Sequence, residues 1–88
     1  MAMIEGTLHL TLLSNNTVQF VFMPNTGSGN SRPLLAKNTG QAEYDLTHTW
    51  DFSPEKARAA IEELEKSRQV ERRISIEEAT VSFMFEAR

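Results

Sequence analysis

Apolar and polar residues alternate along two segments near the start of the chain, the pattern of half-buried β-strands. In segments 4–13 and 17–23 one set of apolar side chains falls on even positions: Ile4, Leu8, Leu10, Leu12, Val18, Phe20 and Phe22. A two-residue hairpin loop would split these side chains between both faces of the sheet, whereas a three-residue loop, Ser14–Asn16, gathers them on one. We therefore predict the longer loop, with Asn16 in a left-handed conformation. The predicted cross-strand pairs are Leu12 with Val18, Leu10 with Phe20 and Leu8 with Phe22.

A second hairpin is predicted after a small polar run. A short apolar piece at about 33–37 is predicted as one strand, and the turn residues 37–40 follow it. Apolar and polar residues alternate from Ala42 to Phe52. The segment 41–50 is therefore predicted as a long strand that pairs with the short one. One side of this alternation carries Ala42, Tyr44, Leu46, His48, Trp50 and Phe52.

An amphipathic helix is predicted from Pro54 to about Gln69. Ser53 suits the N-cap and Pro54 the first helical position, and the helix dipole favours Glu55 in the first turn. Phe52 before the cap is spaced to pack against the first turn as a hydrophobic staple. The apolar stripe of this helix consists of Ala57, Ala60, Ile61 and Leu64.

The end of the chain contains two apolar runs that are out of phase. Ile74 and Ile76 are apolar at even positions, whereas the run 81–87 is apolar at odd positions. We expect a bulge or a tight turn at 77–78, between the two runs. The segment 80–86 is predicted as a strand that is partly buried on both sides.

Together these elements predict an α+β fold in a single domain, residues 1–88. The sheet would be mainly antiparallel with four to five strands, one amphipathic helix would pack on one face, and the order would be ββ(β)βαβ. A chain of 88 residues buries only about 60 to 65% of its unfolded surface, so its core is thin. A second copy of the chain would help to cover an apolar sheet face.

Composition narrows the function classes. The chain is 40% hydrophobic and 24% charged, with a formal net charge of -3, so a role in gripping a phosphate backbone is disfavoured. It contains no cysteine, which excludes disulfides, thiolate chemistry and cysteine-ligated zinc. No window approaches the roughly 18 apolar residues of a membrane span, and Met1–Gly6 lack the pattern of a secretion signal. We expect a cytoplasmic protein without a membrane partner.

The polar run Asn25–Arg32 is the sharpest candidate for ligand binding. Glycine lets backbone N–H groups converge on an anion, serine hydroxyls add donors, and an arginine can hold a phosphate bidentately. The run lacks the spacing of a P-loop and does not lead into a helix, so it also fits a solvated connection between hairpins. The loop residues assigned to this candidate site are Gly27, Ser28, Gly29, Ser31 and Arg32.

Three side chains on the predicted long strand have two interpretations. Tyr44, His48 and Trp50 share one strand face. They are either core side chains beneath the helix or, if the helix packs elsewhere, an exposed patch that adds to the ligand site.

Apolar residues remain on the second sheet face and predict an interface, because exposed apolar patches mark contact sites. They are Leu13, Val21, Met23 and Met84. Edge strands could also pair with another chain. Either route supports a homodimer.

Catalytic and cofactor chemistry find little support in the sequence. His9 and His48 lack the local spacing of metal ligands, and neither is locally tied to a nucleophile. Glutamates are interleaved with the arginines around Arg72, so this cluster has little excess positive charge. Nucleic acid is therefore an unlikely partner. We expect no metal or cofactor, and a non-catalytic interaction module, an adaptor or inhibitor of a larger protein. The alternative is a small-molecule binder that captures a phosphorylated or nucleotide-like ligand through the Asn25–Arg32 loop.

Overall fold

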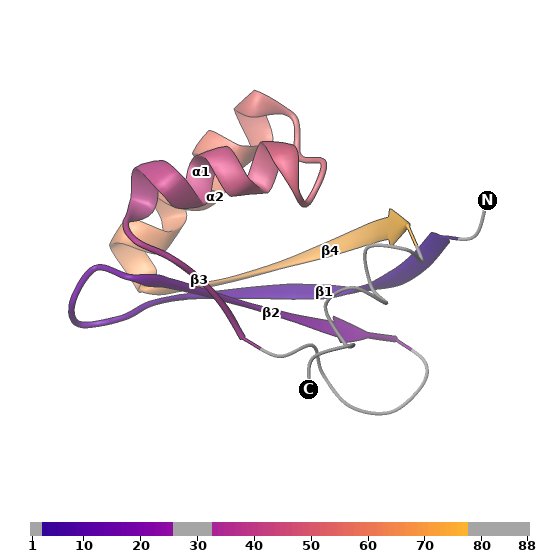
Figure 1. The fold of residues 1–88 in the computed structure, drawn as a ribbon, viewed down its shortest axis with the longest axis horizontal. Helices are drawn as coiled ribbons and strands as arrows, with labels where there is room; N and C mark the ends of the chain where they lie inside the picture. Colours follow the sequence, from indigo (N-terminus) through magenta and orange to yellow (C-terminus); the bar gives the residue numbers. More distant parts are fainter. Residues whose placement is uncertain (1–2, 26–32, 78–88) are drawn as a thin grey trace.

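The computed structural model describes residues 3–25 and 33–77, which form an antiparallel sheet with two helices on one face (Figure 1). The elements follow the order β1 (Met3–Leu12), β2 (Val18–Pro24), β3 (Leu34–Ala36), α1 (Thr39–His48), α2 (Pro54–Ser67) and β4 (Gln69–Glu77). The four strands lie in the spatial order β3-β2-β1-β4, and every neighbouring pair is antiparallel. The predicted α+β class is therefore confirmed.

The first hairpin has the predicted register. Leu12 pairs with Val18, and the pairing continues along both strands. Asn16 is left-handed with φ of 70°, as the three-residue loop requires. The even positions of β1 and β2 face the helices, and their large side chains, Leu8, Leu10, Leu12, Val18, Phe20 and Phe22, are buried in the core.

The prediction of a long strand over 41–50 is wrong, because residues 41–48 belong to helix α1. Asn38 caps the helix, and its Oδ1 accepts a hydrogen bond from the backbone N–H of Gln41 at 2.8 Å. Ala42 and Leu46 are buried one helical turn apart. In an alternating pattern, every second apolar residue is four positions further along the chain. Four positions are also about one helical turn, so the same residues can form the buried face of a helix.

The predicted second hairpin is consequently wrong as well. β3 pairs with β2, placing Ala36 opposite Val18 and Leu34 opposite Phe20. The described part of the fold therefore has two helices rather than the one predicted, and the exact predicted order of elements is not confirmed.

Helix α2 has the predicted start and the predicted buried stripe. The Ser53 hydroxyl accepts from the Lys56 N–H at 3.2 Å, and Pro54 occupies the first turn. The buried residues are the predicted Ala57, Ala60, Ile61 and Leu64. Arg68 ends the helix in a left-handed conformation, and its carbonyl accepts from the Leu12 N–H at 2.8 Å, which starts the pairing of β4 with β1.

Ile74 and Ile76 belong to β4 on its helix-facing side, and β4 ends at Glu77. The predicted strand at 80–86 lies outside the described residues. No helix in the described ranges is long and apolar enough to cross a membrane.

Candidate interaction surface

The sheet has a covered face and an open face, and the difference follows from the pleat. Even positions of β1 and β2 point toward the helices, so odd positions point to the opposite side. In Figure 1 both helices lie on the same side of the sheet. No described helix covers the other side, which we call the open face.

Apolar side chains gather on the open face along β2 and β3. Met23 is 39% exposed and Leu35 is 63% exposed, while Val21 is half-buried. Leu35 lies opposite Gln19, which is two residues before Val21 on the same face of β2. Exposed apolar side chains at neighbouring positions form a patch that another protein can cover.

Two of the predicted interface residues therefore lie on the open face, and a third is close to it. Val21 and Met23 lie there as predicted, and Leu13 is half-buried just beyond the end of β1. Met84 lies outside the described residues. Sequence reasoning missed Leu35, although strand alternation between Leu34 and Ala36 could have identified it as the outward residue.

The open face becomes polar toward β1 and β4. His9 lies directly opposite Glu71, and its Nδ1 is 3.5 Å from a Glu71 carboxylate oxygen. Thr7 lies opposite Arg73, and Thr11 opposite Gln69. The open face thus has an apolar half over β2 and β3 and a charged half over β1 and β4.

The predicted ligand site is not assembled by the described residues. Its loop members, Gly27, Ser28, Gly29, Ser31 and Arg32, lie outside them. Trp50 is buried at 3% exposure and stacks on Phe20, with ring centroids 6.1 Å apart. Tyr44 and His48 are exposed on the other side of α1. The prediction that Tyr44, His48 and Trp50 share a face is wrong, because a helix turns 100° per residue and separates positions that a strand would align.

Tyr44 and His48 form an exposed stacked pair one helical turn apart. Their ring centroids are 3.8 Å apart, and the planes are inclined by 18°. The His48 Nδ1 is 2.9 Å from the Tyr44 carbonyl oxygen. The same Nδ1 is 2.9 Å from the Thr47 hydroxyl, which donates to the Tyr44 carbonyl at 2.8 Å. A shallow depression beside the pair is also lined by Gly40, Glu43, Thr47, Phe52 and Pro54.

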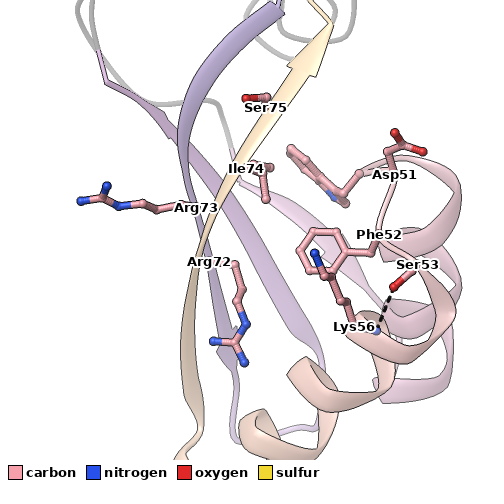
Figure 2. A pocket seen from close by; sticks show the side chains of 9 residues that line it. Asp51, Phe52, Ser53, Lys56, Arg72, Arg73, Ile74 and Ser75 are labelled. Carbon is pink, nitrogen blue, oxygen red and sulfur yellow. Dashed lines mark hydrogen bonds between the residues drawn. The ribbon is translucent and has the colours of Figure 1, made fainter.

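A cavity of about 610 Å³ lies between the start of α2 and β4 (Figure 2). Trp50, Phe52 and Ile74 form its apolar wall. Arg72 reaches toward α2, and its Nη2 is 2.7 Å from a Glu63 carboxylate oxygen. Arg73, by contrast, points away from the helices.

Two of the arginines near β4, Arg72 and Arg68, are held by partners within the chain. Besides the ion pair with Glu63, the Arg72 Nη1 donates to the Glu71 carbonyl at 2.9 Å. The Arg68 guanidinium donates to the Leu13 carbonyl at 3.0 Å. These contacts tie β4 to α2 and to the end of β1.

Within 3–25 and 33–77, no three potential metal ligands among His, Cys, Asp and Glu cluster together. Comparisons with protein-family models, with curated proteins and with solved structures found no match to this chain. The geometry of the open face is therefore the basis for a functional proposal.

Proposed function

We propose that the protein is a small non-catalytic interaction module, an adaptor or inhibitor of a larger protein, which works as a homodimer in the cytoplasm. The observation that carries this proposal is the apolar half of the open face, where Met23 and Leu35 are exposed beside the half-buried Val21. Burying exposed apolar surface favours association by about 25 cal/mol per Å² before the costs of binding.

In this proposal the larger protein covers the apolar half of the open face. The exposed residues there, Met23 and Leu35, sit on strands packed against a buried core, so they form a preorganised surface and lose little entropy on binding. The charged half beside it supplies the polar surroundings typical of protein interfaces.

Affinity capture with paired variants tests this proposal. The wild-type chain and a Met23→Lys/Leu35→Lys variant are immobilised and exposed to the same lysate, and retained proteins are quantified by mass spectrometry. Lysine places a charge in the proposed contact, so a specific partner of the wild-type chain is expected to be depleted at least tenfold.

The matched control is Ala59→Lys/Ser67→Lys, which adds the same charge at exposed positions of α2. This control should retain the partner. Equal capture by the wild-type chain and by both variants would contradict a role for the open face.

A second candidate function is capture of a phosphorylated or nucleotide-like ligand by the Asn25–Arg32 loop. The exposed Tyr44–His48 stack and the depression beside it support this alternative, since stacked rings can receive a base. A thermal-shift screen with inorganic phosphate and nucleotides would show stabilisation that Arg32→Ala removes. The interaction module predicts no such shift.

A further inference from the structure

We propose that two copies of the chain join through the outer edges of their β4 strands, in an antiparallel register that places Glu71 of one copy opposite Arg73 of the other. This inference rests on the proposed homodimer and specifies its contact. It starts from the position of β4, which is a nine-residue strand at the end of the sheet order and has no described strand on its outer side. A strand edge of this length without a partner strand among the described residues is a template for another strand.

The backbone hydrogen bonds of β1 show which residues of β4 direct their backbone N–H and C=O groups away from β1. The Leu12 N–H donates to the Arg68 carbonyl, so even positions of β1 bond toward β4. On the other side of β1, the Leu13 N–H donates to the Thr17 carbonyl, and the Asn25 N–H donates to the Glu5 carbonyl. Hydrogen-bonding direction alternates along an antiparallel pair, so the odd positions of β4 turn their N–H and C=O groups outward.

The charge sequence of β4 selects one register for a second copy. A symmetric antiparallel pair relates each residue to a fixed partner, and the register centred on Arg72 places Glu71 opposite Arg73 twice. In the same register Val70 meets Ile74, and Gln69 meets Ser75. Opposite charges directly across a strand pair stabilise it, whereas like charges destabilise it.

The neighbouring registers lack this match. A register centred on Glu71 places the Glu71 residues of the two copies opposite each other. A register centred on Arg73 places the two Arg73 residues opposite each other, and Arg73 has no described ion-pair partner. A centre at Ile74 places Glu71 opposite Glu77. Among these registers, only the one centred on Arg72 places Glu71 and Arg73 opposite each other. This register also keeps the outward backbone groups in phase.

The Arg72 side chains meet at the two-fold axis on the helix side. Each is already paired with its own Glu63 at 2.7 Å, so the two arginines bring two compensating carboxylates. Each Arg72 also donates to the Glu71 carbonyl. That carbonyl has a second lone pair with which to accept the N–H of the partner's Arg73.

This dimer would extend the open face. A two-fold axis perpendicular to the sheet keeps the helices of both copies on one side and both open faces on the other. The result is a continuous sheet made of the four described strands of each copy, with an apolar patch toward each end. A larger protein could engage both patches at once.

A charge-swap series measured by sedimentation equilibrium tests the register. Glu71→Arg and Arg73→Glu each turn two attractive cross-strand pairs into repulsive ones, and each should weaken association about tenfold or more. The double variant Glu71→Arg/Arg73→Glu restores opposite charges and should return the dissociation constant to within about threefold of the wild-type value. His9→Asn controls for the intramolecular contact of Glu71 and should leave association unchanged.

A proline pair tests the edge itself. Ser75→Pro removes an N–H that points outward, while Leu35→Pro removes the equivalent outward N–H at the opposite edge of the sheet. Ser75→Pro should abolish the dimer and Leu35→Pro should preserve it. Circular dichroism checks that each variant folds, and the charge swaps decide the question if a proline variant does not fold.

The outcomes separate this inference from the proposed function. A dimer that ignores both charge swaps and Ser75→Pro would overturn the β4 contact and leave the homodimer in place. Loss of the dimer with Leu35→Pro alone would move the contact to the β3 edge. A wild-type chain that is monomeric at all concentrations would overturn both proposals.

Discussion

The two faces of the sheet use the same strands in different ways. On the covered face, Phe20 and Phe22 are at most 2% exposed and contact Trp50 from the loop after α1. On the open face, Met23 is 39% exposed and Leu35 is 63% exposed. The covered face therefore supplies the stability of the domain, and the open face can change at little cost to the fold. We therefore expect substitutions on the covered face to lower the stability of the domain, and substitutions on the open face to leave it nearly unchanged.

The largest difference is expected between Phe20→Ala and Val21→Ala, adjacent residues on opposite faces. Phe20 stacks on Trp50 in the core, so its truncation should cost about 3 to 5 kcal/mol of unfolding free energy. Val21 is half-buried, and its truncation should cost about 1 kcal/mol or less. Urea denaturation measures both. Equal losses would break the distinction between the faces.

A second pair of variants concerns glycines, one in the sheet and one in a helix. A Cβ at Gly6 would lie 2.5 Å from the Met23 carbonyl oxygen and 2.8 Å from the Pro24 Cα, both on the backbone of β2. Gly6→Ala should therefore destabilise the domain by about 1 to 3 kcal/mol.

Gly40 lies in the first turn of α1, where its nearest neighbour to an added Cβ is the Asn38 Oδ1 at 3.4 Å. Gly40→Ala should stabilise the protein by about 0.4 to 1 kcal/mol. Thermal unfolding of the two variants gives the signs, and a stabilising Gly6→Ala would contradict the close approach of β1 to β2.

The helix caps are the next test, because α1 must stay helical to place Leu46 over the covered face. Asn38→Ala removes the side-chain oxygen that accepts the Gln41 N–H, and it should cost about 1 kcal/mol. Asn38→Asp keeps an acceptor and should retain most of the stability. If Asn38→Ala is as stable as the wild-type chain, the cap contributes nothing.

The smallest effect on stability is expected on the open face. Met23→Lys should change the unfolding free energy by less than about 0.5 kcal/mol, since the side chain is already 39% exposed. The mass of the dimer should also be unchanged, because the proposed self-contact lies at β4. A large loss of stability would show that Met23 is buried in solution.

The success of sequence reasoning followed the strength of local signals. The first hairpin was predictable because alternation and loop length select one register, and α2 was predictable because Ser53, Pro54 and a four-residue stripe agree. Segment 39–48 was not, because positions 42 and 46 satisfy both the strand and the helix period. Asn38 is a good N-cap residue and could have indicated the start of helix α1, but it was assigned to a turn.

The candidate surface was only partly predictable for the same reason. Val21 and Met23 were found from the alternation of β2, which the hairpin fixes. The separation of Trp50 from Tyr44 depends on the helical state of 39–48, which tertiary packing of Ala42 and Leu46 decides. The proposed β4 contact also needed the hydrogen-bond direction of the β1–β4 pair, which no residue pattern contains.

The mass of the wild-type chain in solution tests the central claim most directly. Sedimentation equilibrium over a range of concentrations should show a reversible approach to twice the 10.0 kDa mass of the chain. High salt should weaken this association, because its register depends on exposed charge pairs. A mass of 10.0 kDa at every concentration would contradict the account of a self-associating interaction module.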